Sequence, residues 1–115
     1  MGRQQISMTP VAADAACVLG QQIRLARHAK NWTAAELAAR AAVSRATVSA
    51  IEQGSPNPSI GNVLNVAAMA GVPLFGAEDR AQLAMLRRIG QEKIALLPTR
   101  VDHPHERDDD GAFDF

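Results

Sequence analysis

The chain has 115 residues, enough for one domain with a short extension. Hydrophobic residues make up 47% of it, which can supply a core, and the net charge of zero gives no overall attraction to nucleic acid. The single cysteine, Cys17, excludes an intrachain disulfide framework, and we expect it to be a small buried thiol in a cytoplasmic protein. No apolar run approaches the ~20 residues that span a bilayer, so we expect no membrane partner.

The charges are distributed unevenly along the chain. Residues 1–100 carry 11 basic and 6 acidic side chains, a net charge of +5, whereas residues 101–115 carry 1 basic and 6 acidic side chains, a net charge of −5. This asymmetry indicates a basic body that can meet phosphate and an acidic tail with a separate role. Because residues 98–115 are polar, acidic and interrupted by proline, we expect this tail to be disordered when free.

The composition favours an all-α fold. Aromatic residues are only 3% of the chain, and its apolar residues are mostly helix-forming alanine and leucine. A first helix is predicted from Thr9, an N-cap followed by Pro10, to about Lys30, with Asp14 as a second candidate start. Its apolar stripe is formed by Leu19, Ile23 and Ala26.

A short second helix is predicted after it. Thr33 and Glu36 have the spacing of a capping box, which opens a helix that ends near Ala41. Trp32 precedes the cap and can pack on Leu37 as a hydrophobic staple. The residues expected to face inward are Leu37, Ala38 and Ala41.

A third short helix follows a tight connection of two residues. Ser44 is its N-cap, the helix extends over residues 45–53, and Gly54 stands just beyond its end. Val48 and Ile51 are three residues apart and therefore share one face, which we expect to be buried.

Two further helices complete the pattern. Ser59 caps a helix over residues 60–70 that Gly71 closes, and a fifth helix is predicted over residues 78–97, where Pro98 stops it. The expected apolar stripe of the fourth helix is Ile60, Val63, Leu64 and Ala67. The fifth helix either forms a dimer seam or packs within the chain on the first and fourth helices, in both cases through Leu83, Leu86 and Ile89.

These elements divide the chain into four parts. We expect residues 1–13 to be a flexible segment with the start of the first helix, and residues 14–76 to be the domain that contains the two short helices. Residues 77–97 are the additional helix, and residues 98–115 are the acidic tail.

Two short helices joined by a few residues are typical of a helix-turn-helix, in which the second helix enters the major groove of DNA. That helix must be apolar on one side and slender on the other, because the groove is about 12 Å wide. Here Val48 and Ile51 supply the apolar side. The side chains left outward are Arg45, Ala46, Ser49 and Ala50.

Residues 19–54 resemble the helix-turn-helix domain of the XRE family, the phage Cro and repressor type. The motifs that carry the resemblance are LGQQIRLAR at 19–27, WTAAELA at 32–38 and VSRATVSAIEQG at 43–54. The resemblance implies a five-helix phage-repressor-like domain and an ion pair between Arg27 and Glu52. Two positions depart from the family pattern: Ala42 stands where the turn usually has glycine, and Ala34 where a glutamine often holds phosphate.

The resemblance and the residue chemistry together assign DNA contacts. We expect Arg45 to be the main base reader, because an arginine can donate two hydrogen bonds to guanine, and the alternative for it is a phosphate contact. The full set of base-reading candidates is Ser44, Arg45, Ala46, Ser49 and Ala50. The candidates for phosphate contact are Lys30, Thr33, Arg40, Thr47, Asn57 and Ser59.

A second resemblance concerns the C-terminal part. The fifth helix, residues 96–101 and the acidic tail with Phe113 and Phe115 resemble HipB-type antitoxins, which are XRE proteins encoded beside a HipA-type Ser/Thr kinase toxin. It implies a homodimer that represses its own operator and neutralises the kinase, with the two phenylalanines as anchors. The tail alternatively only keeps the chain soluble or repels non-cognate DNA.

Two other functions are compatible with the sequence. The chain is alternatively a free-standing regulator with no toxin partner, or an interaction module that has lost DNA binding. We expect no enzyme, cofactor or metal site, because His28, His103 and His105 have no clear catalytic or ligating partner and no glycine-rich phosphate loop occurs.

Overall fold

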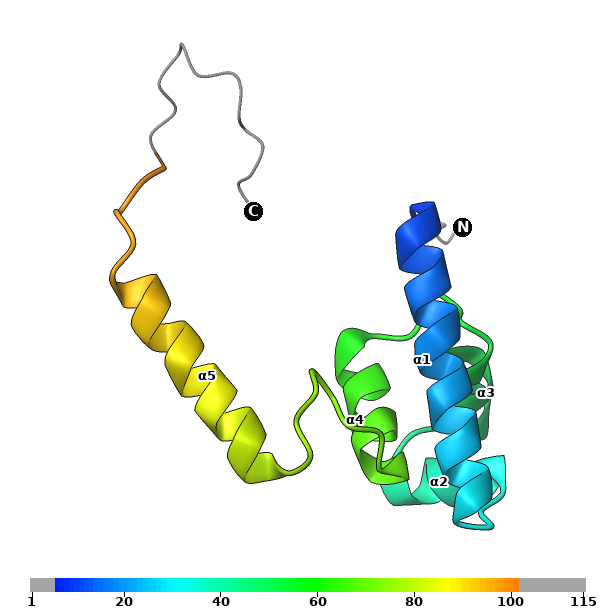
Figure 1. Cartoon of the computed structure of the whole chain (residues 1–115). Helices are drawn as coiled ribbons and strands as arrows, with labels where there is room; N and C mark the ends of the chain where they lie inside the picture. The colour runs from blue at the N-terminus through cyan, green and yellow to red at the C-terminus, as the bar shows by residue number, and fades with distance from the viewer. Residues whose placement is uncertain (1–5, 102–115) are drawn as a thin grey trace.

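The computed structural model describes residues 6–101, which form five α-helices (Figure 1). The helices are α1 (Pro10–Ala29), α2 (Ala34–Ala41), α3 (Arg45–Glu52), α4 (Ile60–Ala70) and α5 (Arg80–Ala95). Extended pairing within this range is limited to one isolated bridge between Leu74 and Ala77. The predicted all-α, five-helix fold is confirmed. None of the described helices is long and apolar enough to cross a membrane.

Side-chain caps fix where the helices begin. Each helix follows a residue whose side-chain oxygen accepts a hydrogen bond from a backbone N–H of the first turn, a contact worth about 1 kcal/mol. These caps are Thr9, Thr33, Ser44, Ser59 and Asp79. The first four are the predicted ones. α5 begins later than predicted, because Asp79 and not an earlier residue accepts the hydrogen bond from Gln82 N–H, at 2.9 Å.

The core lies among the first four helices. Its largest fully buried side chains are Ile23, Leu37, Val48 and Val66, one from each of α1 to α4. Burial of such a side chain stabilises the fold by about 1.5–3 kcal/mol. The core therefore holds α2 and α3 against α1 and α4, which fixes the orientation of the two short helices.

Two burial predictions are wrong. Ile60 is 77% exposed, and the buried side chains of α4 are Val66, Ala67 and Ala70. Ile60 lies in the first turn of α4, at the edge of the stripe, where no neighbouring helix covers it. Cys17 is also exposed, although a Cβ atom at Gly54 would lie only 2.9 Å from its Sγ.

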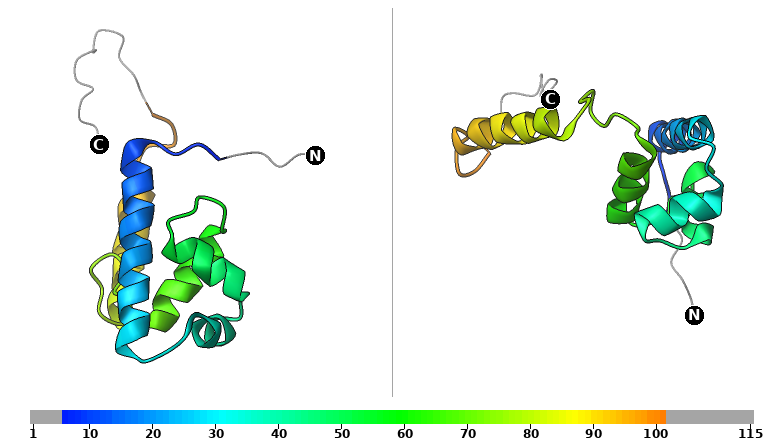
Figure 2. Two further views of the ribbon diagram at one scale, coloured as in Figure 1. Left: turned by 90° about the vertical axis from the view of Figure 1, so that its right-hand side faces the viewer. Right: turned by 90° about the horizontal axis from the view of Figure 1, so that it is seen from below.

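α5 stands apart from the other four helices (Figures 1 and 2). None of its residues is buried, and it does not pack along α1 or α4. The alternative in which Leu83, Leu86 and Ile89 bind these helices within the chain is therefore wrong. The tail with Phe113 and Phe115, and also His103 and His105, lies outside the described residues.

Candidate nucleic-acid interface

The turn between α2 and α3 is built on a left-handed alanine. Ala42 has φ 58° and ψ 42°, and it ends α2 while Val43 N–H donates to the carbonyl oxygen of Ala38 at 3.0 Å. This backbone conformation costs a residue with a Cβ atom roughly 1–2 kcal/mol. The turn therefore has the left-handed conformation that glycine adopts without strain, which is the residue that the family usually has here. Because this chain has Ala42 instead, the backbone of the turn is strained.

α3 is anchored on one face and free on the other. Val48 and Ile51 are buried in the core, and Ser44 Oγ accepts from Thr47 N–H at 3.0 Å. Arg45 is exposed, and within residues 6–101 no hydrogen bond or ion pair engages its guanidinium. Thr47 and Ala50 are half-buried, whereas the exposed positions of the outer face are Ser44, Arg45, Ala46 and Ser49. Apart from Arg45, the side chains on the outer face of α3 are therefore short.

A bidentate ion pair holds the end of α3 against α1. Arg27 Nε donates to Glu52 Oε2 at 2.7 Å, and Arg27 Nη2 donates to Glu52 Oε1 at 2.9 Å. The third donor, Nη1, reaches the carbonyl oxygen of Trp32 at 2.9 Å, before the start of α2. The hydrogen bonds that Arg27 donates to the Glu52 carboxylate raise the pKa of Arg27, against the opposing effect of burial. One buried guanidinium thus connects α1 to both short helices, and the expected pair is present.

Gly20, which has no predicted role, is a positioning residue in α1. A Cβ atom at this position would lie 2.5 Å from the carbonyl oxygen of Ile51 and 2.6 Å from that of Glu52. Glycine inside a helix costs about 1 kcal/mol relative to alanine, which is itself a signal that such a residue has a packing reason. Here the reason is the close approach of α1 to the end of α3.

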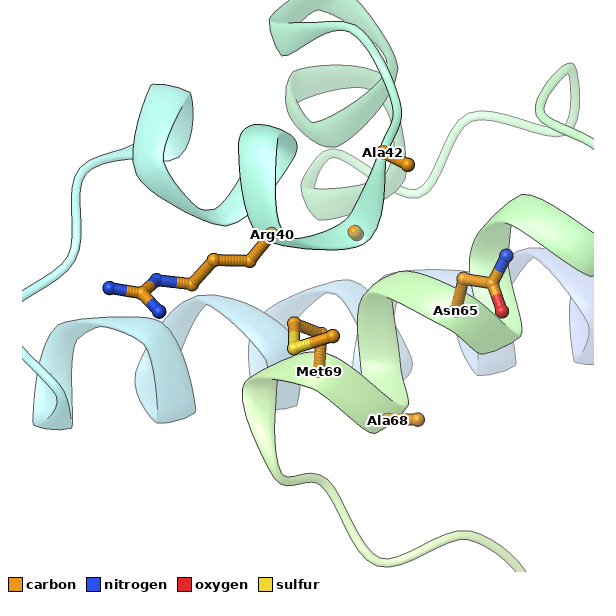
Figure 3. A pocket seen from close by; sticks show the side chains of 6 residues that line it. Arg40, Ala42, Asn65, Ala68 and Met69 are labelled. Carbon is orange, nitrogen blue, oxygen red and sulfur yellow. The ribbon is translucent and has the colours of Figure 1, made fainter.

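Two of the phosphate candidates gather around Trp32. Arg40 Cζ lies 4.3 Å and Lys30 Nζ 5.4 Å from the centroid of the indole ring, so both cations contact the ring face. Arg40 also lines a hollow between α2 and α4, and Figure 3 shows its side chain extending away from Asn65 and Ala42. Lys30 lies beside the C-cap of α4 at Gly71, where the helix dipole favours a cation.

The remaining phosphate candidates lie at helix starts and in the loop after α3. Thr33 uses its backbone N–H and side-chain oxygen in a capping box with Glu36, at 2.7 and 3.0 Å respectively. Asn57 is exposed, and its N–H donates to Ser55 Oγ at 3.1 Å. Ser59 caps α4 at the end of that helix opposite to Lys30. Lys30 and Ser59 therefore lie at opposite ends of α4. Contact of any of these residues with phosphate stays a prediction.

The fold and this arrangement define the class of protein: a helix-turn-helix protein with a braced second helix. A family model described as a helix-turn-helix domain matches residues 18–83, which is more than half of the chain. The chain belongs to this family, which is of the XRE type, and is a DNA-binding regulator. No curated protein and no solved structure matches the chain.

Proposed function

We propose that this protein is a sequence-specific transcriptional repressor that binds operator DNA as a homodimer. The observation that carries the proposal is the arrangement of α3, whose core face is held by Val48 and Ile51 while Arg45 is exposed and unengaged among the described residues. A helix of this kind enters the major groove with its N-terminal residues toward the bases. A dimer then reads two half-sites about 34 Å apart, or a multiple of that spacing.

The base-reading roles follow from the chemistry of the outer face. Arg45 donates two hydrogen bonds to O6 and N7 of guanine, Ser49 offers a hydroxyl to either kind of base pair, and Ala46 contacts a thymine methyl group. Ser44 at the helix start and Ala50 on the half-covered side complete this set. Phosphate contacts, which position the protein without sequence preference, are proposed for Lys30, Thr33, Arg40, Thr47, Asn57 and Ser59.

Substitution of Arg45 tests the proposal. An operator is first obtained by selecting bound sequences from random DNA, and Arg45→Ala is then expected to lose about 1–3 kcal/mol of operator binding and little binding to random DNA. Gel-shift titrations on both DNAs measure the two losses. Arg88→Ala is the matched control, because it removes an exposed arginine on α5. Equal losses of affinity for both DNAs would show that Arg45 contacts phosphate and does not read bases. An affinity that does not depend on salt would contradict DNA binding altogether.

A second proposal is that the protein is a HipB-like antitoxin that neutralises a HipA-like Ser/Thr kinase. Its support is the resemblance of the C-terminal part together with the net charge of −5 over residues 101–115, with Phe113 and Phe115 as apolar anchors in a charged segment. A free-standing regulator would have no such partner. A kinase gene beside the gene for this protein would favour the antitoxin.

Deletion of residues 104–115 tests the kinase proposal. Calorimetry with a HipA-type kinase is expected to show weaker binding by the shortened protein than by the full chain, because the two aromatic anchors are gone. Operator affinity in the same preparation is the control and is expected to stay unchanged. An unchanged kinase affinity would exclude the tail from the interface.

A further inference from the structure

α5 carries an apolar face that no described part of the chain covers. Three large side chains on it, Met85, Leu86 and Ile89, are 40–52% exposed, and Ile94 near the end of the helix is 67% exposed. A single helix of this length is marginal in water, and Gly90 lowers its stability further. The face is a structural reason to expect a partner for α5.

α1 has a second apolar strip on its outer side. Val11, Val18 and Leu25 are seven residues apart and are 50–79% exposed, so they form a line on the side of α1 away from buried Ile23. This line is about 21 Å long, close to the roughly 24 Å length of α5. Shallow hollows flank Leu25, one lined by Gln21, Arg24 and His28 and the other by Gln22, Ala26 and residues 71–73. A repeat of seven is the spacing at which one helix packs along another.

The connection to α5 directs the helix away from its own α1. Val72 and Ala77 are buried on either side of a turn, and Ala77 N–H donates to the carbonyl oxygen of Leu74 at 3.0 Å. Phe75 and Gly76 within this turn both have positive φ, 57° and 74°. Exposed Glu78 and Asp79 join this turn to α5, which extends away from the other four helices (Figure 2).

We propose that the occupant of the outer strip of α1 is α5 of a second copy, packed reciprocally in a homodimer. This inference rests on the proposed dimeric repressor and names its interface. Six large apolar side chains of the two faces are exposed in each copy, and a stable interface buries about 800 Å² on each partner around an apolar centre. α3 packs on the inner side of α1, so the dimer leaves the outer face of α3 open to DNA.

Sedimentation equilibrium of the full chain tests the interface. The unsubstituted protein is expected to be a dimer, and Leu25→Glu on α1 and Ile89→Glu on α5 are each expected to raise its dissociation constant roughly 100-fold, because each buries a charge. Ala84→Glu, on the opposite side of α5, is the matched control and is expected to stay dimeric. Circular dichroism shows that each variant retains its helices. A dimer that Ile89→Glu dissociates and Leu25→Glu does not would overturn the proposal in favour of pairing between two α5 helices.

Cross-linking gives an independent measurement. In a Cys17→Ala background, chains with Leu25→Cys are exchanged with chains with Ile89→Cys and oxidised, and a mixed disulfide dimer is expected. A cross-link formed by the Ile89→Cys chains alone, or the absence of the mixed one, would contradict the arrangement. A monomeric protein that still prefers operator DNA through Arg45 would contradict this interface but not the proposed function. A dimer that has no preference for operator DNA would contradict the proposed function but not the interface.

Discussion

Helices α1 to α4 and helix α5 begin with the same kind of side-chain cap, yet only the first four bury side chains against one another. A side-chain cap therefore suffices to start a helix in both regions, whereas the position of a helix in the fold depends on the side chains that it buries. In the body formed by α1 to α4, Arg27 and the four core residues hold α3 in contact with α1. In α5, by contrast, no residue is buried, and the helix follows a turn closed by the bridge between Leu74 and Ala77.

The largest effect is expected from the ion pair in the body. Glu52→Ala leaves the buried Arg27 guanidinium without its carboxylate, and we expect a loss of roughly 3–5 kcal/mol in the free energy of unfolding. Both side chains are 10% exposed or less, so solvent screens the pair weakly. Because its pKa is raised, Arg27 stays charged at every pH up to strongly alkaline values, and its contribution to stability is lost only above them.

Urea unfolding measures this loss. Glu92→Ala, at an exposed position of α5, is the control and is expected to change stability by less than about 0.5 kcal/mol. Similar losses for the two substitutions would mean that the body and α5 do not differ in the way described.

A glycine-to-alanine change is expected to have opposite signs in the two regions. Gly20→Ala brings a methyl group against two backbone carbonyl oxygens and should destabilise the fold by about 1–3 kcal/mol. Gly90→Ala meets no atom within 4 Å in the structure and should stabilise α5 by up to about 1 kcal/mol. Thermal unfolding followed at 222 nm, a wavelength that reports helix, compares the two. A stabilising effect of Gly20→Ala would contradict the close approach of α1 to α3.

The smallest effect concerns the turn of the body. Ala42→Gly relieves a left-handed alanine and is expected to stabilise the protein by about 1 kcal/mol. Ala39→Gly, three residues earlier inside α2, is the control and should destabilise it by a similar amount. Denaturant titration of both variants gives the two values, and equal signs would show that Ala42 is not strained.

The helix boundaries were accessible from the sequence because their causes are local. Thr33 with Glu36 and Ser44 with Thr47 lie within one helical turn of each other, so the residue types alone indicate the hydrogen bonds. The pair of Arg27 with Glu52 is separated by 25 residues, and only the family resemblance indicated it. Residue chemistry by itself would have left these two charges unconnected.

The exposed positions of Ile60 and Cys17 could not be predicted, because both depend on how far a neighbouring helix extends. The same holds for α5, whose apolar face is compatible with packing inside the chain or on a second copy. At the candidate site, the contact of Arg40 with Trp32 also depends on the folded arrangement, since the side chains meet only after α2 has formed. Gly20, in contrast, was visible as a glycine within a helical pattern and is explained only by the structure.

The stacking of two cations on Trp32 has a practical consequence. Trp32 is the single tryptophan of the chain, so its fluorescence reports one environment. If Arg40 turns toward a DNA phosphate, the indole loses a contact worth about 0.5–1 kcal/mol and its emission changes. The protein thus contains an intrinsic optical probe that responds to Arg40 leaving the ring, and stopped-flow mixing with DNA can time that motion without any label.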